Sequence, residues 1–304
     1  MLGANTSITI IVPVYNEEKR IEKNIEKLVT YCNEKEWDFE LIFVEDGSND
    51  KTCSIVNGFS LLDSRIKLLS LPTRLGKGGS IISAVLSYPT KEYVAYMDAD
   101  LAAGPSELER LLNNIQDCDV IIGSRILSGD LMSIKRPYYR SILSHLYSRL
   151  FRILFRIPIL DPQCGLKLFR KDIVKKLFEA IMTPDFAFDT DLIVTAFSQD
   201  LKIKEVPINW NHGTDSKVRI LREIKSMGID LLSIWYKFHL LWRQHKITYP
   251  QKRGSVYGRI LFALLSSNNE IQRRHQEHLN IISLIPKFLF ILVPILLTLE
   301  LSVT

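Results

Sequence analysis

The sequence predicts an α/β protein whose mainly parallel sheet carries helices on both faces. Two observations lead to this prediction. Residues 8 to 125 alternate between apolar runs of strand length and segments with helical charge patterning, and the apolar runs are continuous. Continuous apolar strands are typical of parallel sheets that are buried on both sides. With 304 residues, 46% hydrophobic and 24% charged, the chain has the composition of a globular protein with one large core.

Each expected strand is an apolar run, rich in β-branched or aromatic residues, that ends in polar residues. Their boundaries are 8–15 (ITIIVPVY), 39–48 (FELIFVEDGS), 66–71 (IKLLSL), 93–100 (YVAYMDAD) and 119–125 (DVIIGSR). Helices are expected over 17–35, from about residue 49, over 76–88 and from Pro105. Pro105 and Glu107 suit a first helical turn, because proline needs no backbone partner there and a carboxylate favours the helix N-terminus.

Further along the chain, three segments predict contact with a membrane. Residues 138–157 and 219–242 have the composition of amphipathic helices in a membrane interface, and the alternative is a core helix with one solvated face. In the first helix, one side is expected to hold His145, Arg149, Arg152 and Arg156, and the opposite side Leu146, Leu150, Ile153, Leu154 and Ile157. Residues 281–303 are apolar enough to span a bilayer, and Arg273 and Arg274 before them predict a cytoplasmic N-terminal end. An in-plane hairpin is the alternative for this segment.

Cysteine usage and the amino terminus predict that the part of the chain holding the cysteines lies in the cytoplasm. The four cysteines, Cys32, Cys53, Cys118 and Cys164, lie far apart and form no CxxC pair. This spacing favours reduced thiols over a disulfide framework or a zinc site. The amino terminus lacks a charged segment before its apolar run, so no signal peptide is expected.

Positive charge is concentrated in residues 125–176. This stretch holds seven Arg and five Lys against three Asp, a net charge of +9, whereas the whole chain carries +5. Because the arginines are interleaved with Tyr, Leu and Phe, we favour an anionic partner, such as phosphate or membrane headgroups, over a solvated face. We expect no nucleic acid among the partners.

The fourth expected strand ends in two carboxylates, Asp98 and Asp100. Side chains two residues apart in a strand point the same way, so the two like charges need a cation between them or a proton on one of them. Carboxylates completed by water and phosphate oxygens are typical of a Mg²⁺ or Mn²⁺ site. The alternatives are that Asp100 caps the following helix or that both acids define a turn.

Five motifs occur in order at successive strand ends: IVPVYNEE (11–18), VEDGSND (44–50), RLGKGG (74–79), DAD (98–100) and GSR (123–125). Together they resemble the family 2 glycosyltransferases, inverting enzymes of the GT-A fold. DPQCGLKLF (161–169), FAFDTDLI (186–193) and VPINWNHGTDSKV (206–218) resemble more narrowly the dolichyl-phosphate β-glucosyltransferases, and less closely the dolichol-phosphate mannose synthases. The resemblance covers about residues 8–240. It implies a GT-A domain over 1–245. Residues 246–304 lie outside the resemblance, and their apolar segment predicts a membrane-associated region.

The resemblance also implies roles for single residues. The pocket around base and ribose would be formed by Pro13, Tyr15, Glu17 and Asp46, with Lys77 near the nucleotide and Lys217 near the pyrophosphate. Asp98 would lie beside the ribose and the metal ion, and Asp100 would be the principal metal ligand. The residues that match acceptor-phosphate binders are Arg125, Arg136, Arg140 and Ser144. Mannose synthases carry a further metal-binding Gln where this chain has Ala102, which favours glucose as the donor sugar.

A lipid phosphate acceptor fits this chemistry. A phosphate monoester has a second pKa of about 6 and is mostly a dianion at pH 7. It therefore needs cationic positioning rather than a general base. Asp189 and Asp191 stay open: one is a candidate base, whereas Asp189 or Thr190 alternatively caps the helix that follows. The candidate catalytic residues are thus Asp100, Arg125 and Asp189.

The sequence therefore predicts inverting transfer of glucose from UDP-glucose to a polyprenyl phosphate of the dolichyl type. The reaction would use Mg²⁺ or Mn²⁺ and take place at the cytoplasmic face of a membrane. One alternative keeps the mechanism and takes GDP-mannose as the donor. A second transfers sugar to a saccharide hydroxyl, and a third is a catalytically silent membrane scaffold with the same fold.

Overall fold

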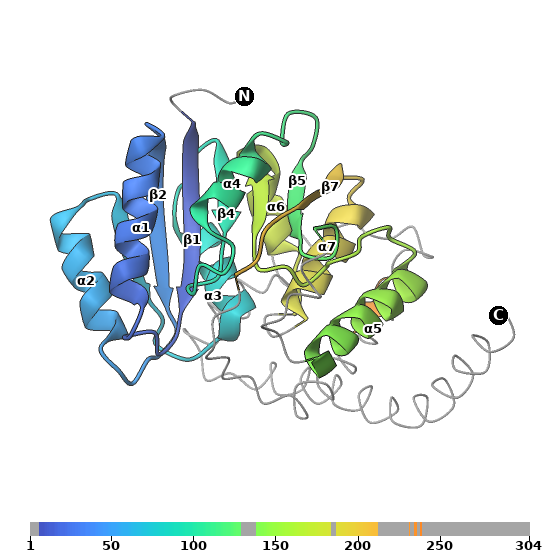
Figure 1. Ribbon diagram of the computed structural model, residues 1–304, viewed down its shortest axis with the longest axis horizontal. Coiled ribbons are helices and arrows are strands. Elements are labelled where there is room, and N and C mark those ends of the chain that lie inside the picture. Colours follow the sequence, from blue (N-terminus) through green and yellow to red (C-terminus); the bar gives the residue numbers. More distant parts are fainter. Residues whose placement is uncertain are drawn as a thin grey trace, which may run out of the picture.

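The computed structural model describes residues 6–128, 138–183 and 187–211, together with residues 231, 234, 235 and 238. Side chains of residues 138–143 are not among those described. Within this part of the chain, one sheet lies at the centre and helices cover both of its faces (Figure 1).

The sheet has seven strands within the described residues, in the spatial order β3-β2-β1-β4-β6-β5-β7. Their bounds are β1 (Ser7–Val14), β2 (Asp38–Glu45), β3 (Ile66–Ser70), β4 (Tyr93–Tyr96), β5 (Val120–Ser124), β6 (Lys167–Arg170) and β7 (Ile203–Pro207). Neighbouring strands are parallel except where β6 runs antiparallel between β4 and β5. The five strands expected from the sequence are all present, and β6 and β7 are additional.

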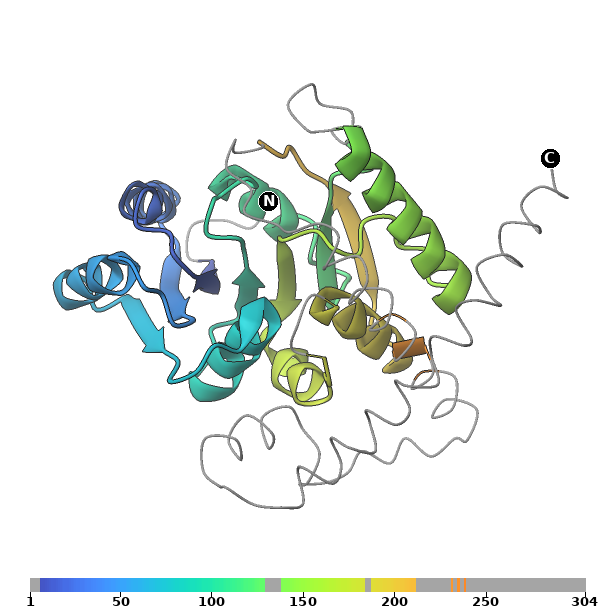
Figure 2. The same cartoon turned by 90° about the horizontal axis from the view of Figure 1, so that it is seen from below.

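The helices form two layers (Figure 2). Their bounds are α1 (Ile21–Glu34), α2 (Thr52–Leu62), α3 (Gly76–Ser87), α4 (Pro105–Leu112), α5 (Tyr138–Phe155), α6 (Lys171–Glu179) and α7 (Phe188–Ser198). Helix α1 packs beside α2 and α4 on one face, and α3 packs beside α6 and α7 on the other. This arrangement confirms the predicted mainly parallel sheet with helices on both faces.

The antiparallel strand β6 positions one end of the site. Tyr96 at the end of β4 pairs with Lys167 at the start of β6. The start of β6 therefore lies at the edge where the parallel strands end, and continuing the same register by two residues places Gly165 opposite Asp98. Lys167 interrupts an apolar run and has the character of a surface residue, which is why this strand was not predicted; in the structure it is fully buried.

The core lies between the sheet and the two helix layers, and it fixes the strands that carry the site. On β1, Ile8, Ile10 and Ile11 are fully buried, and Phe39 and Phe43 on β2 are almost so. Burial of one such side chain stabilises the fold by about 1.5–3 kcal/mol. All four cysteines are free thiols, as expected.

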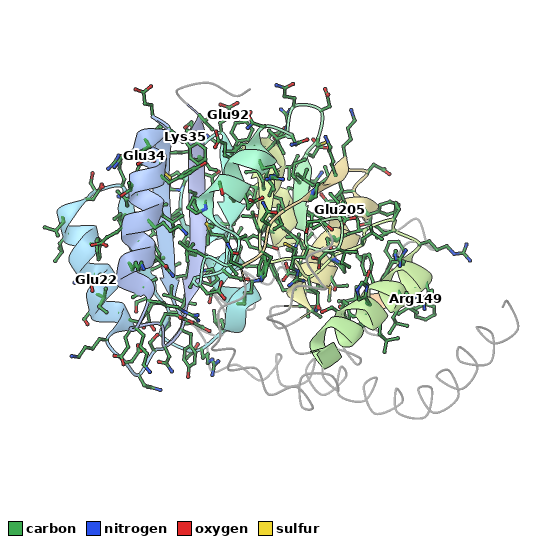
Figure 3. All side chains as sticks on the ribbon, in the orientation of Figure 1. Glu22, Glu34, Lys35, Glu92, Arg149 and Glu205 are labelled. Carbon is green, nitrogen blue, oxygen red and sulfur yellow. The ribbon has the colours of Figure 1, made fainter. Side chains whose placement is uncertain are left out.

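Helix α5 packs on the domain through two aromatic residues that the prediction assigned to neither side. Phe151 and Phe155 are buried against the domain, whereas Leu146 and Ile153 are 60% and 51% exposed. Arg149, labelled in Figure 3, is exposed on the same outer side. Leu150 and Leu154 are half-buried against the core and Ile157 is buried, so the apolar side expected from the sequence packs on the domain in part and is exposed in part. The outer surface of α5 combines apolar and cationic side chains.

The other predicted membrane segments lie outside the described residues. Of residues 219–242 only four positions are described, and residues 246–304, including the expected spanning segment 281–303, are not. Among the residues that the structure describes, no helix combines the length and apolarity that a membrane crossing requires.

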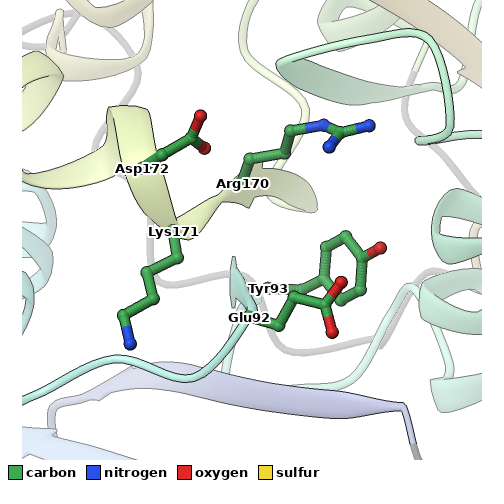
Figure 4. Close-up of a pocket in the computed structure, with 5 residues that line it drawn as sticks. All are labelled: Glu92, Tyr93, Arg170, Lys171 and Asp172. Atoms are coloured by element: carbon green, nitrogen blue, oxygen red, sulfur yellow. The ribbon is translucent and has the colours of Figure 1, made fainter.

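A surface pocket opens where the parallel strands begin, at the edge opposite to the predicted site (Figure 4). It is lined by Glu92, Tyr93, Arg170, Lys171 and Asp172. The Arg170 guanidinium donates Nε–H to the carbonyl oxygen of Cys118 at 2.9 Å. Arg170 thus stabilises the loop after α4, and the pocket contains none of the predicted site residues.

Candidate active site

The predicted site residues gather at the edge where β1, β2, β4 and β5 end, which lies at the bottom of Figure 1. Tyr15 follows β1, Asp46 follows β2, Asp98 and Asp100 follow β4, and Arg125 follows β5. Ligands of open α/β sheets bind beyond the carboxyl ends of the strands. The sheet therefore brings these residues together as the sequence predicts.

Asp98 is bound to a lysine of the glycine-rich segment. Lys77, in the first turn of α3, places its Nζ 2.8 Å from Asp98 Oδ1. Asp100 Oδ1 accepts the backbone N–H of Ala102 at 3.0 Å, so Asp100 defines a turn, one of the two alternatives offered by the sequence. It does not cap α4, because the residue at the N-cap is Gly104. Burial, followed by the negative charge of Asp98, raises the pKa of the Asp100 carboxyl.

The carboxylates of Asp98 and Asp100 suit a hard divalent cation. Among the described residues, no cluster of three or more His, Cys, Asp or Glu side chains forms a complete metal cage. A Mg²⁺ or Mn²⁺ ion that keeps several waters and binds substrate phosphates needs only one or two protein carboxylates. Burial and the negative charge of Asp98 raise the pKa of Asp100, so a cation beside the two carboxylates would relieve their repulsion. The residues therefore fit such an ion.

Asp189 lies at the centre of a buried polar network. Its Oδ1 accepts the Tyr96 hydroxyl at 2.5 Å and also binds the Nζ of Lys167, while its Oδ2 lies 3.6 Å from Lys77 Nζ. Burial alone would raise the pKa of Asp189, but the two ammonium groups hold it below its usual range. The helix cap is Ala187, so Asp189 does not cap α7. Because Asp189 is already bound by these groups and has a low pKa, it is a poor proton acceptor.

Asp191 is also engaged within the fold. Its Oδ2 accepts the backbone N–H groups of Met182 at 2.8 Å and Thr183 at 3.0 Å, and its Oδ1 accepts the Thr195 hydroxyl. Asp191 thus holds the segment after α6 against α7. Both carboxylates that the sequence offered as bases have structural partners.

Arg125 is clamped by an acid that sequence reasoning did not single out. Its Nε and Nη2 donate to the two oxygens of Asp161, each at 2.7 Å, and the guanidinium lies 5.0 Å from the Trp210 ring. Glu205 on β7, labelled in Figure 3, accepts the backbone N–H groups of Leu160 and Asp161 at 2.7 Å. Although burial lowers the pKa of Arg125, Asp161 raises it overall, and Asp98 adds to this effect. Arg125 and Asp98 therefore share one electrostatic environment.

The residues predicted to bind the nucleotide form a second group around β1 and β2. Asp46 accepts the backbone N–H groups of Leu75 at 2.6 Å and Gly76 at 2.9 Å, and burial raises its pKa. The guanidinium of Arg74 stacks on the Tyr15 ring at 3.8 Å. Asp46 thus fixes the turn that leads into α3, where Gly76 has a φ of +73°, a backbone conformation that glycine adopts at little cost.

Glu17 and Pro13 complete this group. Glu17 pairs with Arg20 through both of its carboxylate oxygens, and its backbone N–H donates to the Thr52 hydroxyl at 2.7 Å. Arg20 also lies near enough to Asp100 to lower its pKa in part. Pro13 is half-buried on β1 and pairs in register with Val44. Sequence reasoning missed Arg20, although it follows directly on the first motif.

Three predicted residues fall outside what the structure describes. Arg136 and Lys217 are not described, nor is the side chain of Arg140. Ser144 is half-buried on α5. One turn further along this helix, the Tyr147 hydroxyl lies 2.5 Å from the Thr190 hydroxyl oxygen, which ties α5 to the start of α7.

Gly165 is a site residue that sequence reasoning missed. A Cβ atom at this position would lie 1.8 Å from Asp98 Oδ2 and 2.5 Å from its Cγ. The backbone at residue 165 therefore forms the wall against which the Asp98 carboxylate rests. The signal lies in the motif DPQCGLKLF, where Leu166 and Leu168 alternate with Lys167 as in a short strand.

Comparison with known proteins gives consistent relatives. A model of the family described as "Glycosyl transferase family 2" matches residues 9–178. A dolichyl-phosphate beta-glucosyltransferase of Trichomonas vaginalis is 33% identical over 247 residues, covering 77% of this chain and 75% of the relative. A protein of the same name from Dictyostelium discoideum is 29% identical over 254 residues, covering 79% and 77%.

Solved structures resemble this chain in fold. A glucosyl-3-phosphoglycerate synthase from Mycobacterium tuberculosis, in complex with Mn²⁺, UDP and glucosyl-3-phosphoglycerate, superposes with a TM-score of 0.53. The two chains are 18% identical, and the likeness covers 77% of this chain and 80% of that chain. It supports the α/β fold class that the sequence predicts.

Proposed function

Since the chain belongs to glycosyl transferase family 2, we propose that it transfers glucose from UDP-glucose to dolichyl phosphate with inversion at the anomeric carbon. The relatives from Trichomonas vaginalis and Dictyostelium discoideum, both named for glucosyl transfer to dolichyl phosphate, support this choice of donor sugar and acceptor. Ala102, where mannose synthases carry Gln, supports glucose as well. Its side chain is buried and its backbone N–H orients Asp100.

The observation that carries the proposal is the group formed by Lys77, Asp98 and Asp100 at the end of β4, with Arg125 in the same electrostatic environment. Asp98 and Asp100 would hold a divalent cation. When bound there, such an ion would neutralise the negative charge that develops on the departing diphosphate. Lys77 supplies a further positive charge close by, and Arg125 offers a guanidinium fixed by Asp161.

The acceptor is inferred from the state of the two candidate bases. Asp189 is held by Lys167, Lys77 and Tyr96, and Asp191 by backbone N–H groups. A hydroxyl acceptor needs a carboxylate that is able to take a proton, whereas a phosphate dianion does not. The structure therefore favours the phosphate acceptor over the saccharide hydroxyl.

In the proposed reaction, an oxygen of the acceptor phosphate attacks the anomeric carbon on the face opposite to UDP. A bond forms between this oxygen and the carbon as the bond from the carbon to the diphosphate oxygen breaks. The bonding electrons leave with UDP, so no proton has to move. The protein's own contribution is to position two anionic groups with cationic side chains and to keep them in line.

We place the reaction at the cytoplasmic face of a membrane. The outer side of α5 presents Leu146 and Ile153 beside exposed arginines, as expected of a helix that rests in a lipid interface. This helix is tied to α7, which carries Asp189, through the contact between Tyr147 and Thr190. The spanning segment over 281–303 stays a prediction from the sequence.

A donor screen tests the proposal. Membranes containing the full chain, polyprenyl phosphate and Mn²⁺ or Mg²⁺ are supplied with UDP-glucose or GDP-mannose. The lipid products are identified by mass spectrometry. We expect a hexosyl lipid phosphate from UDP-glucose and loss of this product in excess EDTA. If only GDP-mannose gave a product, the donor sugar would be mannose rather than glucose. Product formation in excess EDTA would contradict the role of the divalent cation. Failure to bind any nucleotide sugar would favour the silent scaffold.

Replacement of Asp191 by asparagine separates the two acceptor classes. Loss of a general base lowers a rate by about 10²–10⁴-fold. With a phosphate acceptor, Asp191→Asn is expected to keep more than about one tenth of the wild-type rate, because the bonds of Asp191 to Met182, Thr183 and Thr195 are structural. Initial rates of glucosyl lipid formation measure this. A loss of 100-fold or more in a folded variant, on the scale of a missing base, would support the hydroxyl acceptor instead.

A further inference from the structure

We propose that Lys77 is a built-in counter-ion of Asp98 that a divalent cation displaces, and that Asp189, fixed by Lys167, then retains the displaced ammonium. Cation binding at this site is thus an exchange of one positive charge for another. The inference rests on the proposed function in one respect, the divalent cation held by Asp98 and Asp100.

The position of Lys77 is the starting point. Its Nζ lies 2.8 Å from Asp98 Oδ1 and 3.6 Å from Asp189 Oδ2, so it already lies between the two carboxylates. An ammonium group has three donors and rotates freely, so it can bind either carboxylate. The Lys77 side chain as a whole is 34% exposed, which leaves it room to move.

Asp189 is suited to receive the ammonium because its other oxygen is immobilised. Lys167 is fully buried, donates to the Cys164 carbonyl at 2.8 Å and binds Asp189 Oδ1, which also accepts the Tyr96 hydroxyl. Lys167 and Tyr96 therefore stay bound to Oδ1 when Lys77 moves. Oδ2 is thus the oxygen of Asp189 that faces Lys77, and a shift of the ammonium by about the difference between the two distances brings it into full contact.

Charge balance gives the reason for the exchange. Asp98, Asp100 and Asp189 carry three negative charges against the two positive charges of Lys77 and Lys167. Two arginines nearby are already paired with other acids, Arg125 with Asp161 and Arg20 with Glu17. A divalent cation placed beside Asp98 would repel the ammonium, because like charges a few ångströms apart repel strongly in an environment of low dielectric constant. Lys77 must then leave Asp98, and its new position next to Asp189 keeps a positive charge at the site for the diphosphate.

Two consequences follow for binding. In the protein without nucleotide, Lys77 competes with the cation for Asp98, so the cation binds weakly. The diphosphate of the donor offers Lys77 another partner, so nucleotide and cation bind more tightly together than apart. Lys77 is therefore a positioning residue for the cation site. Lys167 is a second positioning residue, because it fixes Asp189, which receives Lys77.

Binding of Mn²⁺ alone tests the inference in the full chain, measured by electron paramagnetic resonance without any nucleotide. Lys77→Met, which removes the competing charge, is expected to bind Mn²⁺ about 10-fold more tightly than the wild type. Lys91→Met is the matched control, because it removes one positive charge from the ion pair with Asp38 at the other end of the sheet. Its Mn²⁺ affinity should equal that of the wild type.

A second neutral variant, Lys77→Gln, guards against misfolding, and thermal melting checks that each variant is folded. Unchanged or weaker Mn²⁺ affinity in both folded variants would overturn the inference, because a merely structural role predicts no gain. The test is independent of sugar transfer. If the wild type transferred no glucose while Lys77→Met gained Mn²⁺ affinity, the proposed function would fail and the exchange would stand. If the wild type transferred glucose but Lys77→Met gained no Mn²⁺ affinity, the proposed function would stand and the exchange would fail.

Discussion

Replacement of Gly165 by alanine is expected to lower the rate of glucosyl transfer by about 100-fold or more while the domain still folds. The new Cβ would lie 1.8 Å from Asp98 Oδ2, and real Cβ contacts are longer than 3.0 Å, so the carboxylate must move by more than 1 Å. Asp98 would then lose its contact with Lys77 and its alignment with Asp100. Displacement of a catalytic group by about 1 Å costs on the order of 10²-fold in rate.

Two other glycines provide matched controls for Gly165→Ala. A Cβ at Gly104 would have only Ser106 Oγ at 3.8 Å as a neighbour, and a Cβ at Gly58 on α2 would meet nothing within 4 Å. Both alanine variants should keep wild-type rates, measured as initial rates of lipid-linked glucose formation. A Gly165→Ala variant with Asp98 unmoved in a crystal structure and a wild-type rate would contradict the prediction.

Replacement of Asp161 by asparagine is expected to lower the free energy of unfolding by about 3–5 kcal/mol, because it leaves the buried Arg125 guanidinium without its counter-charge. Both side chains are nearly inaccessible, 11% and 5% exposed. Although burial acts to raise the pKa of Asp161, Arg125 holds it below its usual range. Because the folded-state pKa is depressed, the stabilisation is complete above the unfolded value of about 3.9 and declines as the pH falls through the folded one.

Denaturant unfolding at several pH values measures this loss. The difference between the wild type and Asp161→Asn should be largest at neutral pH and shrink below about pH 4. Asp63→Asn is the control, because Asp63 pairs with Arg65 at the surface, where ion pairs contribute only about 0–1 kcal/mol. Equal losses for the two variants would show that burial of the Arg125 pair carries no special weight.

The sequence predicted the parts of the fold that depend on local pattern. Residues 8–15 and 93–97 are continuous apolar runs, and they form β1 and β4 with their acids at the expected edge. Pairing of distant segments was beyond such reasoning. The strand β6 is four residues long and contains Lys167, whose burial depends on Asp189 from another part of the chain. Only the folded structure brings these two charges together.

The candidate site shows the same division. Motifs located Lys77, Asp98, Asp100 and Arg125, because each follows the end of a predicted strand or begins a helix. The sequence left Asp189 open between base and cap, since a carboxylate in a first helical turn suits both. Its partners decide against capping, and its two lysine neighbours favour an anchoring role. Likewise, the sequence did not distinguish Phe151 and Phe155, which are buried on α5, from Leu146 and Ile153, which are exposed, because Leu and Phe carry similar weight in a helical pattern.

The direction of β6 has a consequence for how this chain is able to diverge. The polypeptide leaves the sheet after Ser124 and re-enters it at Lys167 on the same rim, so residues 125–166 start and finish on one side of the scaffold. That span holds Arg125, Asp161 and α5, and it contacts the rest of the fold through Glu205 and Thr190. An insertion between these contacts would therefore leave the strand ends that carry Asp98 and Asp100 in place.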